Sequence, residues 1–147
     1  MATVLIVEDD LLIAYMVEEF VIAHGYQTCG IARTVAEAVV LARQHKPDLA
    51  VIDLRLADGG FGTEIVAQLA PLDRPGILFA TGNAAQFELT TTDGDACLDK
   101  PFRAADLIRG LEVVAGIVTT GIARPPFPPG FRVLPVPANA TGVPTHG

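Results

Sequence analysis

Five side chains suited to phosphoryl chemistry stand where apolar runs of this sequence end. Three are carboxylates: Glu8 and Asp9 follow the run TVLIV, and Asp53 ends the run DLAVID. The other two, Thr81 and Lys100, follow the runs GILFA and DACLD. Three converging carboxylates without a counter-ion would raise one another's pKa, so they call for a hard divalent cation with oxygen ligands, above all Mg²⁺.

Lys100 and Thr81 indicate what this cation would act on. A lysine supplies a fixed positive charge and a threonine supplies a hydroxyl donor, and both suit the oxygens of a phosphoryl group. The predicted chemistry is phosphoryl transfer onto a carboxylate, with Asp53 as the nucleophile. Any one of these carboxylates taken alone is more often a solvated loop end, so the prediction depends on the five positions occurring together.

The elements that must position these groups are short strands alternating with helices. The apolar runs at residues 3–7, 26–32, 48–53, 76–80 and 95–99 are typical of buried strands. Asp10 is the expected N-cap of a helix over 12–24, Thr34 and Glu37 form a capping box for the next helix, and further helices are expected at 61–69 and 104–118. Because parallel strands need crossover helices, the pattern predicts an α/β fold with a five-stranded parallel sheet and helices on both faces.

Two stretches depart from this pattern. Residues 81–95 contain three consecutive threonines and leave room only for a short fourth helix of low propensity. Residues 119–147 carry seven prolines and no acidic residue, which favours an extended tail that is either flexible or laid along the domain surface. We therefore expect one domain over residues 1–118 and a Pro-rich C-terminal tail over 119–147, with no output domain.

Composition narrows the possible partners. Seventeen acidic and ten basic side chains give a net charge of −7, which would repel nucleic-acid backbones and anionic membranes. The sequence shows no leader and no apolar run of about 18 residues. Its two cysteines, Cys29 and Cys97, lack metal-ligand spacing and are expected to be small buried hydrophobic residues. A soluble, cytoplasmic protein without nucleic-acid or membrane partners is expected.

Four stretches in order, VLIVEDD, VIDLRLADG, FATG and CLDKPF, resemble the receiver domain of bacterial two-component response regulators. The resemblance covers about residues 2–118 and includes the interval of 44 residues from Asp9 to Asp53. It implies the flavodoxin-like receiver fold with strand order 2-1-3-4-5. It also implies a phosphoprotein of a phosphorelay rather than an enzyme, with chemistry limited to its own phosphorylation and dephosphorylation.

The same resemblance implies a role for each site residue. Asp53 would accept a phosphoryl group from a histidine kinase or a phosphotransfer protein. Mg²⁺ would be bound by Asp9 and Asp53, by Glu8 through water, and by the backbone carbonyl of Arg55.

The stretch CLDKPF would supply the remaining contacts. Lys100, together with Thr81, would contact the phosphoryl oxygens, and a cis bond before Pro101 would aim the lysine amine into the site. The common receiver has an aromatic residue where Cys97 stands, so the usual aromatic relay is in doubt. The FATG stretch, with Gly82, is similar instead to a subgroup of stand-alone receivers typical of alphaproteobacteria, in which the following loop rearranges.

Output is expected to come from the receiver surface, by binding a downstream protein or by draining phosphoryl groups from a kinase. A homodimer is possible, although the tail could occupy the usual pairing face. Two alternatives stay open. An aspartyl-nucleophile phosphatase or phosphotransferase would want an aspartate where Arg55 stands, and a receiver-like interaction module would never be phosphorylated.

Overall fold

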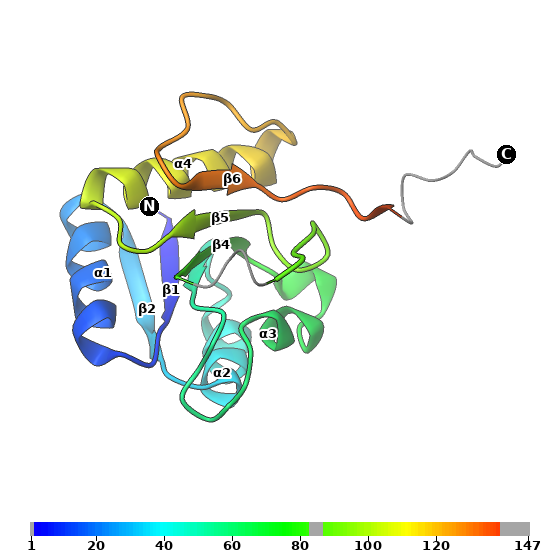
Figure 1. The fold of residues 1–147 in the computed structure, drawn as a ribbon. Coiled ribbons are helices and arrows are strands. Elements are labelled where there is room, and N and C mark those ends of the chain that lie inside the picture. Colours follow the sequence, from blue (N-terminus) through cyan, green and yellow to red (C-terminus); the bar gives the residue numbers. More distant parts are fainter. Residues whose placement is uncertain (1, 83–86, 139–147) are drawn as a thin grey trace, which may run out of the picture.

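The computed structural model describes residues 2–82 and 87–138, which form one twisted sheet with helices on both faces (Figure 1). In sheet order the strands are β2 (Gln27–Ala32), β1 (Thr3–Val7), β3 (Leu49–Ile52), β4 (Gly76–Thr81), β5 (Ala96–Asp99) and β6 (Phe131–Val133). Neighbours from β2 to β5 are parallel, whereas β6 is antiparallel to β5. The predicted α/β class and the order 2-1-3-4-5 are confirmed, but the predicted sheet is one strand short.

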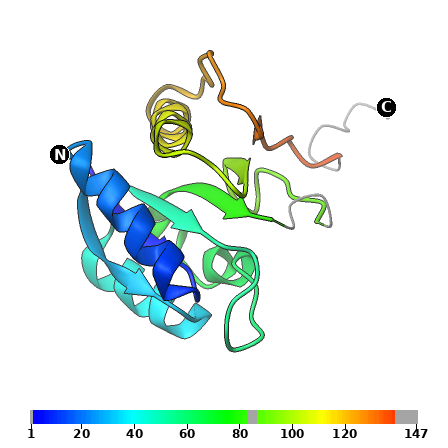
Figure 2. The same cartoon turned by 60° about the vertical axis from the view of Figure 1, so that its left-hand side comes forward.

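The helices cover the sheet in pairs. Helices α1 (Leu11–Ala23) and α4 (Ala104–Thr120) lie on one face, and α2 (Val35–His45) and α3 (Thr63–Ala67) lie on the other. A short 3-10 helix, η1 (Pro71–Asp73), precedes β4. Figure 2 shows α1, in dark blue, crossing in front of the strands. None of the described helices is long and apolar enough to cross a membrane.

Two separate cores follow from the alternation of side chains along the strands. On β1, Val4 and Ile6 join the core under α1 and α4, and Leu5 and Val7 join the core under α2 and α3. Both faces of the central strands are therefore apolar, which is why these strands read as continuous hydrophobic runs. The polar side chains next to these strands therefore lie at the strand ends.

The predicted helix caps are confirmed and fix the turns that follow β1 and β2. The Asp10 carboxylate accepts a hydrogen bond from the N–H of Leu12 (3.0 Å). The Thr34 hydroxyl accepts one from the N–H of Glu37 (3.1 Å), and the Glu37 carboxylate accepts one from the N–H of Arg33 (2.8 Å). Because caps of this kind satisfy backbone donors that have no partner inside the helix, α1 and α2 begin where the sequence places them.

The short fourth helix predicted within residues 81–95 is not found in the described part of that stretch. Residues 83–86 lie outside the described residues, and residues 87–95 contain turns but no helix. The Thr90 N–H donates to the Asp93 carboxylate (2.9 Å), which closes one of these turns. Side-chain bonds of this local kind compete with helix formation, which explains why the threonine-rich stretch does not become a helix.

The Pro-rich tail contributes the additional strand. Residues 131–133 form β6 along the outer edge of β5, with Leu98 opposite Phe131 and Ala96 opposite Val133. In Figure 1 the tail, in orange, returns over α4 before it reaches β5. Over its described length the tail therefore lies along the domain surface, which was one of the two expected alternatives.

Candidate functional site

The carboxyl ends of β1 and β3 bring three carboxylates together. Glu8 and Asp9 follow β1, Asp53 follows β3, and one carboxylate oxygen from each residue lies within 4.8 Å of the others. The two strands are neighbours in the sheet, with Val7 opposite Ile52, and the Asp53 N–H donates to the Val7 carbonyl (2.9 Å). The strand ladder itself therefore brings the three predicted carboxylates into one cluster.

Lys100 enters the same cluster from the loop after β5. Its Nζ lies 2.6 Å from Glu8 Oε1 and 3.4 Å from Asp53 Oδ2. Its backbone N–H donates to the Thr81 carbonyl at the end of β4 (3.1 Å). The Lys100–Pro101 peptide bond is cis, as expected. Residues from three strand ends, β1, β3 and β5, thus meet at one corner of the sheet.

Burial dominates the electrostatics of this corner. It raises the pKa of Glu8 from its ordinary value of 4.5 to about 7, against the lowering effect of the hydrogen bonds from Lys100 and from the Asp10 N–H. Burial alone would lower the pKa of Lys100, but the bond to Glu8 and the negative charges of Asp53 and Glu8 outweigh it and raise the pKa. The lysine therefore stays protonated and supplies one positive charge to a site that holds three carboxyl groups.

The donor set fits Mg²⁺. Hard divalent cations take carboxylate oxygens as ligands, and the described residues offer three such oxygens in one cluster. Glu8 is 5% exposed, whereas Asp9 and Asp53 are half-buried and border the solvent. A cation bound here would reduce the burial cost that now falls on the Glu8 carboxylate. The contribution of the Arg55 carbonyl stays a prediction.

Thr81 and Gly82 lie at the adjacent strand end. Thr81 is fully buried at the end of β4, where it lies opposite Asp99 of β5. Gly82 is exposed, and a Cβ added there would meet no atom of the described residues within 4 Å. The predicted contact of the Thr81 hydroxyl with a phosphoryl group, and the role of Gly82 in a rearranging loop, stay predictions.

Arg55 bridges two loops that flank the site. Its guanidinium carbon lies 5.9 Å from the ring centroid of Phe61 and 5.6 Å from that of Phe87. The two rings contact each other edge to face, with centroids 5.9 Å apart. Cation–π contacts of this kind connect the loop after Asp53 with the segment that leads from β4 to β5.

Cys97 is a small buried hydrophobic residue, as expected. Its side chain is 0% exposed, and burial raises the pKa of its thiol to about 11. It belongs to the same core as Leu89 and Leu134. The core that contains Cys97, where the common receiver would carry an aromatic ring, therefore includes a leucine of the Pro-rich tail.

Arg33 is a neighbour of the site that the sequence did not reveal, because no candidate was expected after β2. Its Nε and Nη2 donate to the Asp9 backbone carbonyl at 3.3 and 3.1 Å. The bonds hold the turn that carries Asp9, so Arg33 acts as a positioning residue. Only the adjacency of β1 and β2 in the sheet could have pointed to it.

Gly62 is a second residue of this kind. A Cβ added at Gly62 would clash with the Asp53 backbone carbonyl oxygen and would lie 2.6 Å from Ile52 Cγ2. The Gly62 N–H donates to the Leu54 carbonyl (2.9 Å). Only glycine lets the start of α3 approach the strand end this closely, so Gly62 helps to fix the backbone of Asp53.

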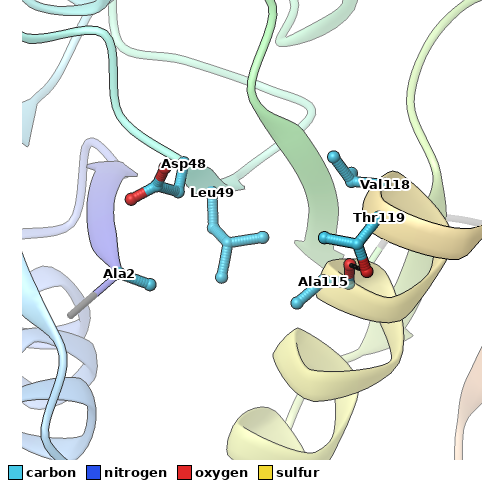
Figure 3. A pocket seen from close by; sticks show the side chains of 6 residues that line it. All are labelled: Ala2, Asp48, Leu49, Ala115, Val118 and Thr119. Atoms are coloured by element: carbon cyan, nitrogen blue, oxygen red, sulfur yellow. Dashed lines mark hydrogen bonds between the residues drawn. The ribbon is translucent and has the colours of Figure 1, made fainter.

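One hollow borders the site and another lies away from it. An apolar groove of about 450 Å³ borders the site and is lined by Ile13, Met16, Lys100, Pro101 and Phe102. The other hollow lies at the opposite, amino-terminal edge of the sheet, where Figure 3 shows Leu49 between Ala2 and the α4 residues Ala115, Val118 and Thr119. Its lining includes Asp48, which accepts a hydrogen bond from the Thr3 N–H (2.9 Å).

Comparison with known proteins gives consistent matches. The family described as response regulator receiver domain matches residues 4–112. The Phyllosphere-induced regulator PhyR of Methylorubrum extorquens is 37% identical over 110 residues, which are 73% of this chain and 41% of that protein. The transcriptional regulatory protein PdtaR of Mycobacterium tuberculosis is 34% identical over 114 residues, which are 75% of this chain and 55% of that protein.

A solved structure agrees with these matches. The anti-anti-sigma factor PhyR from Bartonella quintana is similar with a TM-score of 0.64 and 33% identity, over 82% of this chain and 49% of that one. The chain thus spans about half the length of each of these three relatives. The matched region of residues 4–112 contains every residue of the carboxylate and lysine cluster.

Proposed function

The chain belongs to the family of response regulator receiver domains, and on that basis we propose that Asp53 accepts a phosphoryl group in a Mg²⁺-dependent step. The donor is a histidine kinase or a phosphotransfer protein. The phosphorylated chain signals by binding a downstream protein, or it acts as a phosphate sink, and it does so in the cytoplasm. Signalling rather than turnover of an external substrate is its role.

The observation that carries this proposal is the arrangement of Lys100 between Glu8 and Asp53. The ammonium lies 2.6 Å from one carboxylate and 3.4 Å from the other. A positive charge fixed at this position can neutralise the charge that a phosphoryl group brings to Asp53. At the same time the carboxylates of Glu8, Asp9 and Asp53 provide oxygen ligands for a divalent cation on one side of the acceptor.

The proposed step needs little covalent chemistry from the protein. A carboxylate oxygen of Asp53 attacks phosphorus, the P–N bond to the donor histidine breaks, and its electron pair stays on the imidazole nitrogen. The product is an acyl phosphate. Lys100 and the Thr81 hydroxyl are assigned to the phosphoryl oxygens, and Arg33 and Gly62 hold the backbone of the acidic residues. Bound Mg²⁺ would supply further charge neutralisation.

The apolar groove beside Lys100 supports a protein as the donor. It runs along the α1 residues Ile13 and Met16 and reaches Pro101 and Phe102. Leu12, also on α1, is 82% exposed. Because this apolar surface continues directly into the site, a donor protein that covers it would bring its phosphohistidine to Asp53 and exclude water.

The alternatives receive less support. An aspartyl-nucleophile phosphatase would want an acid two residues after Asp53, but Arg55 stands there, with its guanidinium against the rings of Phe61 and Phe87. A module that is never phosphorylated would not need the cluster of three carboxylates and a lysine.

The test is incubation of the full chain with acetyl phosphate or phosphoramidate, followed by intact mass spectrometry. We expect a gain of about 80 Da in the wild type with Mg²⁺. No gain is expected with EDTA or in Asp53→Asn, which keeps the shape of the side chain and removes its charge. Rapid consumption of the donor without an adduct would favour the phosphatase. No adduct from small donors or from any histidine kinase would favour the inert module.

A further inference from the structure

The outer edge of β5 is covered by a strand from the same chain. The β5–β6 ladder is short, and two backbone bonds extend it at its ends. The Asp99 N–H donates to the Gly130 carbonyl (3.0 Å), and the Leu134 N–H donates to the Asp95 carbonyl (3.0 Å). An edge strand offers a row of backbone donors and acceptors to any extended segment, and residues 130–134 use that row here.

One side chain of the tail fills a seat beside α4. Phe131 packs with the core under α1 and α4, opposite Leu98. A Cβ added at Gly110 of α4 would lie 3.5 Å from the Phe131 ring, an ordinary contact distance, so the ring lies close beside α4 at this position. A second ring, Phe127, stacks at 5.5 Å on the outer side of Phe131. We call this place the aromatic seat.

A second side chain fills a seat on the opposite face of the sheet. Leu134 is 3% exposed and joins the core that contains Leu89 and Cys97. The Thr91 N–H donates to the Pro135 carbonyl (3.0 Å), which fixes the chain just beyond the leucine. We call this place the leucine seat. Because residues 131 and 134 are three apart on an extended chain, their side chains reach opposite faces of the sheet.

Arg109 of α4 holds the segment that leads into β6. Its Nη2 donates to the Arg124 carbonyl (2.8 Å) and its Nε donates to the Pro126 carbonyl (2.9 Å). Both acceptors are backbone groups, which any residue offers. The side chains of Arg132 and Val133, between the two seats, are exposed. The two tail side chains that pack into the domain are therefore an aromatic residue and a leucine.

We propose that the β5 edge with its aromatic and leucine seats is a docking site for an extended strand of a partner protein. Residues 126–135 occupy the site in the resting chain. The partner segment has the same chemistry: an aromatic residue, a leucine three residues later, and prolines on either side. It binds by adding an antiparallel strand to β5 in exchange for β6, as in other cases of strand addition.

The ladder is short enough for such an exchange. Only three residues of β6 pair with β5. Prolines at positions 128, 129, 135 and 137 keep the flanking chain extended and have no backbone N–H to donate. An extended proline-rich segment also loses less conformational freedom when it binds. The site stands whether or not Asp53 is phosphorylated, so its test is independent of the proposed function.

The test uses the full chain with the tail loosened by one substitution. In an antiparallel ladder every second residue of a strand turns its N–H and C=O toward the partner strand. Gly130 and Leu134 bond to β5, so Arg132 turns its N–H toward β5 and Val133 turns its N–H toward solvent. Arg132→Pro should therefore release β6. Val133→Pro is the matched proline control, and Arg132→Ala removes the same side chain while keeping the N–H. Phe131→Ala, which empties the aromatic seat, is a second releasing variant.

The probe is a fluorescent peptide of residues 126–137, measured by anisotropy. We expect it to bind Arg132→Pro and Phe131→Ala at least about tenfold more tightly than the wild type, Val133→Pro or Arg132→Ala. The same peptide with Leu134→Asp should not bind. Hydrogen exchange should show faster exchange of the Phe131 and Leu134 amides in the releasing variants only.

Three results would overturn the proposal. The first is no peptide binding to a chain whose Phe131 and Leu134 amides exchange rapidly. The second is unchanged protection of these amides in Arg132→Pro, because the strand would then not be held by β5. The third is that the releasing variants form dimers in solution and do not bind the peptide. The β5 edge would then pair with a second copy of the chain instead of a partner protein.

Discussion

The ammonium of Lys100 lies 2.6 Å from the carboxylate of Glu8, although 92 residues separate them in the sequence. Both side chains are largely buried, at 20% and 7% exposed. The pair joins the loop after β5 to the end of β1 and places a positive charge 3.4 Å from Asp53. It therefore serves both the stability of the fold and the chemistry of the site.

Lys100→Met should destabilise the chain by about 3 kcal/mol at pH 7, because it leaves buried carboxylates without their cation. The loss should be smaller at pH 5, where Glu8 binds a proton. Lys46→Met is the matched control, because the Lys46–Asp73 pair has the same 2.6 Å separation but an exposed lysine, so its loss should cost less than about 1 kcal/mol. Denaturant unfolding measures both, and equal losses would contradict the assignment.

The burial of Glu8 predicts a pH dependence of stability in the absence of divalent cations. Below pH 4.5 the carboxyl group is protonated in both states. Between pH 4.5 and about 7 the unfolded chain ionises Glu8 while the folded chain keeps it protonated, so the free energy of unfolding falls as pH rises. The fall is at most about 3 kcal/mol.

This dependence can be isolated by comparison with Glu8→Gln in EDTA. The wild type should lose stability relative to Glu8→Gln across that pH range. Added Mg²⁺ should reverse the loss near pH 7, because the cation favours the ionised carboxylate. A difference between the two proteins that stays constant from pH 4.5 to pH 7 would show that Glu8 is not desolvated as the structure indicates.

Gly62→Ala should lower the stability of the chain, whereas Gly82→Ala should leave it unchanged. The new Cβ at Gly62 would clash with the Asp53 carbonyl oxygen, so the strand end must shift, at a cost of about 2 kcal/mol and with slower phosphorylation. The new Cβ at Gly82 would meet no atom of the described residues within 4 Å, so Gly82→Ala should leave the resting stability unchanged. Thermal unfolding and the rate of adduct formation test the pair, and a tolerated Gly62→Ala would remove the positioning role of Gly62.

Cys97→Phe should destabilise the chain by about 1 to 3 kcal/mol, because the thiol is fully buried in an apolar core that a ring would overpack. In Leu134→Ala, which empties part of that core, the same substitution should cost less. Chemical denaturation of the two single variants and the double variant gives the coupling between the two positions. Strict additivity would mean that Leu134 does not occupy the space of the missing aromatic ring.

The clustering of four predicted side chains could be expected because parallel strands carry their carboxyl ends to one edge of the sheet. Glu8, Asp9, Asp53 and Lys100 could be placed together from the ends of apolar runs alone. The contact of Arg33 with the Asp9 carbonyl could not be predicted, because a hydrogen bond to a backbone group leaves no signature in residue types.

Two parts of the fold escaped prediction for physical reasons. The strand β6 has three residues among prolines, which is too short for an alternating pattern, and it forms only because β5 offers an open edge. The fourth helix was expected from spacing, but the bond from the Thr90 N–H to Asp93 favours a turn in the described part of that stretch. A tertiary contact thus creates the strand, and a local side-chain bond competes with a helix whose propensity is low.

The central claim is that Asp53 is the phosphoacceptor, and the most direct measurement locates the modification. An acyl phosphate on aspartate is reduced by borohydride to homoserine, which peptide mass spectrometry can place at one position. After treatment with a phosphoryl donor and Mg²⁺, we predict homoserine at Asp53 in the wild type and no homoserine when EDTA replaces Mg²⁺. Homoserine at Asp9 or at another acidic residue, with Asp53 unmodified, would contradict the account.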